Sequence, residues 1–194
     1  MLPKFARIVF VTLLWSVVAA QQQPNEITFT PDSAASSVSF SLSATMHTVH
    51  GTFTLKKSSV HLSPGVNQIS GEIVLDATSA KTGIDARDNK MHQDVLESAR
   101  YPEITFLPDR VDGTLAMRGA SKIQVHGIFT IHGSQHEMLV PTDVEITPEH
   151  WQATSHFTVP YVQWGMKNPS NFLLHVKDSV EIEVKLGGSN PNKQ

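Results

Sequence analysis

The sequence predicts an all-β protein: an antiparallel β-barrel of about eight strands with one amphipathic helix inserted around residues 86–100. Three observations support this prediction. Apolar and polar residues alternate strictly in many short segments, which places every second side chain on one face of a strand. Glycines interrupt several of the apolar faces, and glycine inside a strand often marks a bend or a close approach. One segment instead has the spacing of a helix with an apolar stripe.

The N-terminus predicts a secretory signal peptide over residues 1–20. Lys4 and Arg7 precede an apolar run over residues 8–18, and small residues then give way to a polar stretch that begins at Gln21. The apolar run is too short to cross a bilayer, which takes roughly 20 residues. Cleavage after Ala20 leaves one domain over residues 21–188, a polar tail over residues 189–194 and no permanent membrane anchor. We therefore expect a periplasmic or secreted protein.

Composition argues against several classes of protein. The chain has no cysteine, so it can form no disulfide and carry no lipid on a thiol, and its fold depends on its core alone. The formal net charge is −3, and no cluster of lysine or arginine is present that could neutralise a nucleic-acid backbone. We expect neither a nucleic-acid partner nor a cofactor.

The first half of the predicted domain has strand periodicity in several segments, with polar residues between the apolar ones. The residues predicted to face inward are Val38, Phe40, Leu42, Ala44 and Met46; Val49, Gly51, Phe53 and Leu55; Ile69, Gly71, Ile73, Leu75 and Ala77; and Ile104 with Phe106.

The helix is predicted between Asp85 and Arg100. Met91, Val95 and Leu96 follow one another at helical spacing and give a narrow apolar stripe. Asp85 is the predicted N-cap. Pro102 disfavours helical geometry at the residue before it, so the helix is expected to end near Arg100.

The second half continues the alternation. One hairpin is predicted around residues 133–134, a further turn at residues 148–149, and the last strand is predicted to end at Leu186 before a polar, glycine-rich segment. The inward residues of these strands are Ile123, Val125, Gly127, Phe129 and Ile131; Met138, Val140, Thr142, Val144 and Ile146; Trp151, Ala153, Ser155, Phe157 and Val159; and Val180, Ile182, Val184 and Leu186.

Alternation alone does not separate a two-sheet sandwich from a closed barrel. Gly51, Gly71 and Gly127 favour a curved sheet, because they lie within the apolar faces. A barrel of about eight strands has an interior that side chains can fill or that can hold one small ligand.

Several short segments spread over residues 26–186 form a recognisable set: residues 36–40 (SSVSF), 50–53 (HGTF), 82–83 (TG), 87–88 (RD), 101–106 (YPEITF), 125–133 (VHGIFTIHG) and 164–165 (WG). Together these segments resemble the YceI-like family. The resemblance implies an exported, lipocalin-like barrel that binds a polyisoprenoid lipid without covalent chemistry. It implies an isoprenoid-type tail among inward apolar side chains and a polar head near one mouth of the barrel.

The candidate ligand-binding residues are the bulky inward side chains and the aromatic residues of a late loop. They are Phe40, Leu42, Met46, Phe53, Ile73, Phe106, Phe129, Ile131, Met138, Phe157, Tyr161, Trp164 and Phe172. For each of them, ordinary core packing is the alternative. Arg87 is a candidate for contact with a polar or phosphorylated head group, since arginine forms bidentate bonds to phosphate. The alternative is that Arg87 and Asp88 serve only the start of the helix.

Two other functions remain open at this stage. The ten histidines raise the possibility of a metal-dependent enzyme, but no zinc-binding motif is present and the period-2 pattern points His126 and His132 outward and His136 inward. We therefore expect neither a metal site nor catalytic residues. The second alternative is a barrel with a solid core that serves as an interaction or stress-related module. Homodimer formation is also open.

Overall fold

The computed structural model describes residues 26–63, 67–172 and 174–192, so the predicted signal peptide lies outside the described residues. The strands are β1 (Ile27–Phe29), β2 (Ser37–Ser43), β3 (Thr48–Ser63), β4 (Gln68–Lys81), β5 (Glu103–Asp112), β6 (Gly119–Ile131), β7 (Ser134–Ile146), β8 (His150–Val159) and β9 (Val180–Ser189). A short helix, α1 (Asp85–Lys90), continues into a π-helical turn, η1 (Met91–Val95), between β4 and β5.

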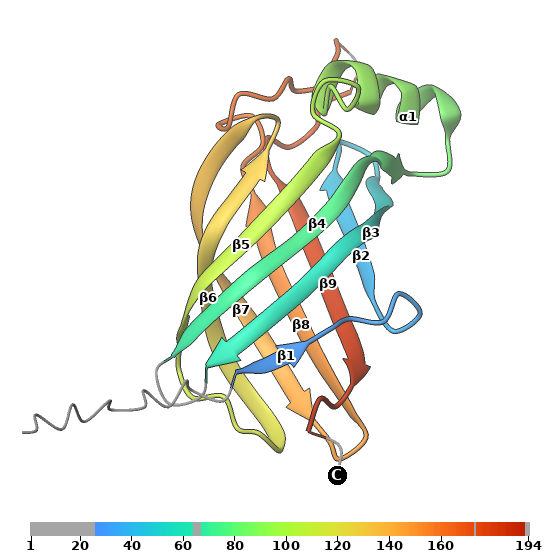
Figure 1. The fold of residues 1–194 in the computed structure, drawn as a ribbon. Helices are drawn as coiled ribbons and strands as arrows, with labels where there is room; N and C mark the ends of the chain where they lie inside the picture. Colours follow the sequence, from blue (N-terminus) through green and yellow to red (C-terminus); the bar gives the residue numbers. More distant parts are fainter. Residues whose placement is uncertain (1–25, 64–66, 173, 193–194) are drawn as a thin grey trace, which may run out of the picture.

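Strands β2 to β9 close into a barrel (Figure 1). Each strand from β2 onward pairs with the next in antiparallel fashion, and β9 pairs with β2 to complete the ring. The prediction of an antiparallel barrel of about eight strands with a single inserted helix is therefore confirmed. A barrel leaves no unpaired sheet edge along its wall.

The strand β1 lies outside the ring and pairs with the far end of β3. Its partners are Val60 to Leu62, beyond the part of β3 that pairs with β2. The sequence predicted neither β1 nor the extension of β3 past Leu55. Three residues are too few to show alternation, and β1 forms because the long strand β3 presents a free edge to it.

Two of the predicted inward glycines make room for phenylalanine rings. A Cβ atom on Gly51 would lie 2.2 Å from the Cζ atom of Phe40, its cross-strand neighbour on β2. A Cβ atom on Gly127 would lie 2.5 Å from the carbonyl oxygen of Leu107 and 2.8 Å from the Cζ atom of Phe106. The close approach at these glycines is thus made by the barrel's own aromatic rings together with neighbouring backbone.

The hairpin between β6 and β7 turns at His132 and Gly133, one residue earlier than predicted. Ile131 pairs with Ser134, and both turn residues have positive φ, 51° and 74°. Positive φ at both central residues is the geometry of a type I′ turn, which favours glycine at the second position.

The helical segment lies where it was predicted but ends earlier and starts differently. The N-cap is Ile84 rather than Asp85, and no side chain caps it. After Lys90 the helical turn contains one residue more than an α-helical turn, because the amide of Leu96 donates to the carbonyl of Met91, five residues earlier, at 2.8 Å. Glu97 then adopts φ 44°, a left-handed conformation that ends the helix well before Arg100.

The last strand runs to Ser189, three residues beyond its predicted end at Leu186. Gly187 and Gly188 are buried and pair with β8. A Cβ atom on Gly188 would lie 2.6 Å from the carbonyl oxygen of Thr30, so these glycines serve close packing rather than a solvated tail.

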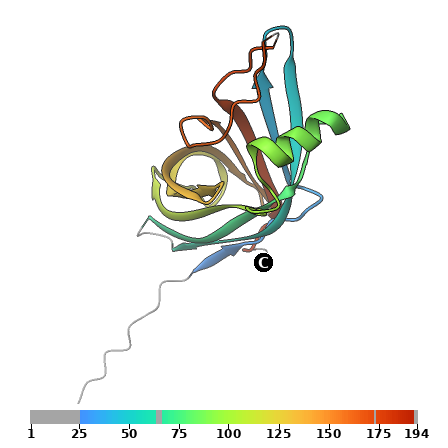
Figure 2. The ribbon, with the colours of Figure 1, turned by 90° about the horizontal axis from the view of Figure 1, so that it is seen from above.

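The two ends of the barrel differ in what covers them (Figures 1 and 2). We call one the helix end: it carries the β2–β3 turn, α1 and the β8–β9 loop, which comprises residues 160–172 and 174–179 among those described. We call the other the β1 end: it carries β1, the β5–β6 and β7–β8 connections and the end of β9. One apolar cluster of the core includes Phe129, Val159 and Tyr161, and a second includes Phe29 and Trp151.

Candidate functional site: an apolar cavity

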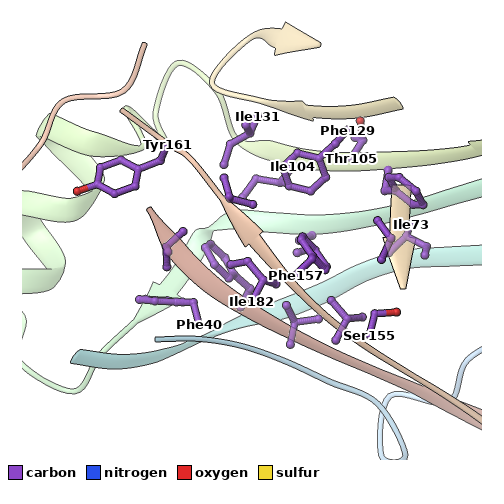
Figure 3. Close-up of a pocket in the computed structure, with 18 of the residues that line it drawn as sticks. Phe40, Ile73, Ile104, Thr105, Phe129, Ile131, Ser155, Phe157, Tyr161 and Ile182 are labelled. Atoms are coloured by element: carbon purple, nitrogen blue, oxygen red, sulfur yellow. The ribbon is translucent and has the colours of Figure 1, made fainter. Parts of the chain in front are cut away.

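A cavity of about 540 Å³ occupies the barrel interior. Every strand from β2 to β9 contributes side chains to its wall, and Figure 3 shows Phe40, Phe129 and Phe157 facing into it with several isoleucines. Most of the wall is hydrocarbon because the inward position of each strand is apolar. The interior is therefore a space, not a core filled by the chain's own side chains.

The cavity is sealed at the β1 end. The lining residues Phe29 and Trp151 are 7% and 5% exposed, and their rings pack edge to face with centroids 5.3 Å apart. Leu62, Val111 and Leu186 lie in the same part of the wall and are also buried. These buried side chains close the β1 end of the cavity more tightly than the exposed residues at the helix end.

The cavity reaches solvent at the helix end. The lining residues His47, Lys90 and Asn171 are exposed there, and they come from the β2–β3 turn, α1 and the β8–β9 loop respectively. Among the described residues that line the cavity, the charged side chains are Arg87 and Lys90, both cationic. We call this opening, defined by His47, Arg87, Lys90 and Asn171, the mouth.

Arg87 is fixed at the mouth by the segment that leads into α1. Its Nε atom donates to the Thr82 hydroxyl at 2.7 Å, and its Nη2 atom donates to the Thr82 carbonyl at 3.1 Å. The Asp88 carboxylate in turn accepts hydrogen bonds from the amide and the hydroxyl of Thr82. Arg87 therefore both supports the helix start and lines the cavity, so the two roles predicted for it are compatible.

The pKa of Asp88 is lowered from its usual range. Partial burial acts to raise it, but the hydrogen bonds from Thr82 and the nearby Arg87 guanidinium favour the charged form and outweigh burial. At neutral pH the Asp88 carboxylate is therefore charged, and it lies close to the Arg87 guanidinium that lines the mouth.

One hydrogen bond and one ion pair tie the β8–β9 loop to the segment formed by α1 and η1. Lys90 Nζ donates to the carbonyl of Pro169 at 3.2 Å, and Lys167 Nζ lies 3.5 Å from Asp94 Oδ1. Within the loop, the hydroxyl of Tyr161 donates to the carbonyl of Lys177 at 2.8 Å. Burial, with a smaller contribution from the nearby Asp178, raises the pKa of Tyr161 to about 12.

The structure brings most of the predicted ligand-binding residues together. The side chains that line the cavity are Phe40, Leu42, Phe53, Ile73, Phe106, Phe129, Ile131, Phe157, Tyr161 and Arg87. They come from six strands, the β8–β9 loop and α1, and strand alternation alone was enough to select the strand residues among them.

Met46 and Phe172 were predicted to face inward, but in the structure they face solvent. They are 90% and 98% exposed. β2 ends at Ser43, and a turn in which the amide of Ala44 donates to the carbonyl of His47 removes Met46 from the strand pattern. Phe172 lies in the β8–β9 loop, where no periodicity fixes the direction of a side chain.

Trp164 and Met138 pack against the core beside the cavity without lining it. Trp164 stacks on His136 with ring centroids 3.9 Å apart and lies 5.8 Å from Phe129. Partial burial lowers the pKa of His136, so this ring favours the neutral form. Trp164 therefore packs against Phe129 of the cavity wall and does not itself line the cavity.

Several residues that were predicted to face inward, but were not among the ligand-binding candidates, also line the cavity. Ile104 and Ile182 lie there (Figure 3), and their inward position follows from the same alternation that selected Phe106. Thr142 and Ser155 also line it and share a hydroxyl hydrogen bond of 2.9 Å. Lys90 could have been found from its spacing of three residues after Arg87, which places both on one side of a helix.

Histidines lie apart from one another in the described ranges. His126 is 2.7 Å from Asp109, and His132 is 3.6 Å from Glu97. Within residues 26–63, 67–172 and 174–192, no three histidine or acidic side chains gather closely enough to hold a metal ion.

In the same ranges no helix has the length and apolar character needed to span a bilayer.

Comparisons with known proteins agree with this architecture. The model of a family described as the YceI-like domain matches residues 29–187. Comparison with curated proteins gave no match.

Solved structures with a similar fold come from several bacteria. A polyisoprenoid binding domain from Saccharophagus degradans, implicated in plant cell wall breakdown, is 19% identical with a TM-score of 0.66, covering 84% of this chain and 98% of its own. BcnA from Burkholderia cenocepacia is 18% identical with a TM-score of 0.67, covering 81% and 99%. The YceI protein of Campylobacter jejuni is 14% identical with a TM-score of 0.63, covering 75% and 86%.

Proposed function

The chain belongs to the YceI-like family, and we propose that its barrel binds a long-chain apolar lipid of the polyisoprenoid type without covalent chemistry. The observation that carries the proposal is the apolar cavity of about 540 Å³, sealed at the β1 end and open at the helix end. The hydrocarbon tail lies inside the barrel, and the polar head lies at the mouth.

The size and lining of the cavity suit a single lipid chain. Ligand pockets are commonly about 300–1,000 Å³ and mostly apolar. Each buried CH₂ group contributes about 0.8 kcal/mol, so a tail with ~20 buried carbons gains on the order of 16 kcal/mol before costs. Association costs roughly 4–15 kcal/mol, and a cavity that exists before binding keeps the ordering part of that cost low.

The solved relatives support the chemical class of the ligand. The Saccharophagus degradans domain, which shares the fold over 84% of this chain, is described as polyisoprenoid binding. A polyisoprenoid tail is a flexible hydrocarbon, and the wall of the cavity offers it apolar contacts along the barrel. Carriage or storage of such a lipid requires no reacting side chain.

Export is part of the proposal. The layout of residues 1–20, with Lys4 and Arg7 before an apolar run, is that of a cleaved signal peptide. Intact mass measurement of protein recovered from the periplasm or medium of its host tests this, with cleavage after Ala20 as the expected result. Retention of residues 1–20 in cytoplasmic protein would contradict export and leave the lipid proposal intact.

Native mass spectrometry of the protein purified from its own host, followed by organic extraction, tests the lipid proposal directly. The expected result is a released hydrocarbon-rich molecule at one copy per chain. Ala153→Phe adds a ring on the cavity wall and is expected to lower the lipid load at least tenfold. Thr154→Phe, one residue along β8 on the opposite face, is the control and is expected to keep the load. Equal load in both variants, both folded, would contradict binding in the cavity.

Arg87→Ala tests the contact with the head group. If Arg87 binds the head, the variant retains less lipid than Arg87→Lys, which keeps the charge, at equal melting temperatures. If Arg87 serves only Thr82 and the start of α1, the melting temperature falls and the lipid load of the folded fraction is unchanged.

A further inference from the structure

Large apolar side chains are exposed unevenly over the described surface. They are Met46, Ile84 and Phe172 at the helix end, which are 90%, 54% and 98% exposed, and Leu107 and Leu139 on the barrel wall, which are 43% and 51% exposed. Single exposed apolar residues are common in soluble proteins, whereas a group around an opening marks an interaction surface.

The three residues at the helix end surround the mouth. Met46 is next to the lining residue His47, Phe172 is next to the lining residue Asn171, and Ile84 is the N-cap of the helix that carries Arg87 and Lys90. We call Met46, Ile84 and Phe172 the crown. They come from three separate segments, each of which also carries residues that line the mouth.

Local hydrogen bonds hold the two most exposed crown residues in place. The amide of Ala44 donates to the carbonyl of His47 at 2.9 Å and closes the turn that carries Met46. The amide of Leu174 donates to Asn171 Oδ1 at 2.9 Å, which closes the turn that carries Phe172. Both side chains point into solvent, at 90% and 98% exposure.

We propose that the crown docks the barrel, mouth first, on the surface of a bilayer that contains anionic phospholipid. The crown supplies apolar side chains that can enter the headgroup region, and the charged residues that line the mouth are the cations Arg87 and Lys90, with the Asp88 carboxylate close to Arg87 but outside the lining. Apolar residues combined with cations favour binding to an anionic interface.

Docking in this orientation removes a barrier to lipid exchange. A hydrocarbon tail that leaves the barrel into water loses about 0.8 kcal/mol for each CH₂ group exposed. A barrel whose mouth touches the bilayer passes the tail from one apolar environment to another. The inference thus extends the proposed lipid function, but the docking itself needs no bound lipid.

Vesicle flotation tests the docking. The protein, purified as its host processes it, is mixed with vesicles of equimolar phosphatidylglycerol and phosphatidylcholine, or of phosphatidylcholine alone. The test variants are Met46→Ser and Phe172→Ser, and the matched controls are Leu107→Ser and Leu139→Ser on the barrel wall. All four side chains are solvent-exposed, so the folds are expected to survive, which circular dichroism checks.

The expected result is binding to the anionic vesicles that weakens about tenfold with each crown substitution, since each removes the apolar gain of one large side chain. The controls bind like the unsubstituted protein, and vesicles of phosphatidylcholine alone bind less. Equal weakening by crown and wall substitutions would overturn the proposal. A second result would also overturn it: no vesicle binding, together with a loss of self-association in the crown variants as measured by sedimentation. The crown would then be a contact between two copies of the chain.

The flotation test and the lipid-load test check the two proposals independently of each other. A protein that retains lipid in native mass spectrometry but does not float contradicts docking alone. A protein that floats through its crown but carries no lipid contradicts the proposed cargo alone.

Discussion

The two ends of the barrel are built for different tasks. At the β1 end, Phe29 and Trp151 pack edge to face and Ile146 is 1% exposed. At the helix end, exposed polar side chains line an opening, and Met46 and Phe172 are 90% and 98% exposed. The comparison teaches that apolar surface stabilises the fold at one end and is left in solvent at the other.

The difference follows from which elements cover each end. The β1 end is covered by strands: β1 pairs with β3, the end of β9 pairs with β8, and Phe29 of β1 packs on Trp151 of β8. The helix end is covered by a short helix and a long loop, joined to each other by Lys90 and Lys167. Side-chain ties of this kind open at lower cost than strand pairing. Substitutions at the two ends should therefore separate stability from exchange.

The largest effect is expected at the β1 end. Trp151→Ala removes a ring that is 5% exposed and packed on Phe29, and we expect a loss of about 3–5 kcal/mol in the free energy of unfolding. Urea denaturation measures it. Phe172→Ala at the helix end is the control, with an expected change within about 0.5 kcal/mol. Similar losses in the two variants would remove the distinction between the ends.

The next effect is expected where the chain enters α1. Asp88→Ala leaves the amide and hydroxyl of Thr82 without their acceptor, and hydrogen bonds to a charged group contribute about 1.5–3 kcal/mol. Because the pKa of Asp88 is lowered in the fold, its contribution is present above the ordinary aspartate pKa of about 3.9 and is lost as the pH falls through the folded value. Denaturation at neutral and acid pH should show the variant less acid-sensitive than the unsubstituted protein.

A smaller effect is expected within the β8–β9 loop. Tyr161→Phe removes the hydrogen bond to the carbonyl of Lys177 and should cost about 1 kcal/mol. With its pKa raised to about 12 in the fold, Tyr161 keeps its proton while the unfolded chain releases it near pH ~10. The stability of the unsubstituted protein should therefore fall as the pH rises between these values. If Tyr161→Phe showed the same fall, Tyr161 would not be its cause.

The smallest effect is expected for the tie across the mouth. Lys167 and Asp94 form an exposed ion pair with atoms 3.5 Å apart, and such pairs contribute about 0–1 kcal/mol. Lys167→Ala should leave the melting temperature nearly unchanged but speed amide hydrogen exchange in the β8–β9 loop. An unchanged exchange rate would show that other contacts hold the loop over the mouth.

The sequence was sufficient for the wall of the barrel and insufficient for its ends. Alternation predicted correctly that Phe40, Phe129 and Phe157 face inward, because the pleat fixes the direction of each side chain once the strand is known. It failed at Met46, since the strand ends three residues earlier and a turn changes the direction. Phe172 lies in a loop without any such periodic constraint.

The helix and β1 show a second limit. The apolar stripe of Met91, Val95 and Leu96 predicts helical backbone correctly, but the widened turn, in which the amide of Leu96 donates to Met91, leaves no periodic trace. The pairing of β1 depends on the part of β3 that extends beyond its pairing with β2. Both are consequences of tertiary structure, which local pattern does not contain.

The positions of β1 and of the end of β9 have a practical consequence. Both lie at the sealed side of the barrel, away from the opening (Figure 1). A tag, fluorophore or support coupled beyond Ser189 would hold the molecule with its entrance pointing into the sample. Immobilised protein could then be presented with vesicles or dissolved ligands, and the attachment would not obstruct their approach.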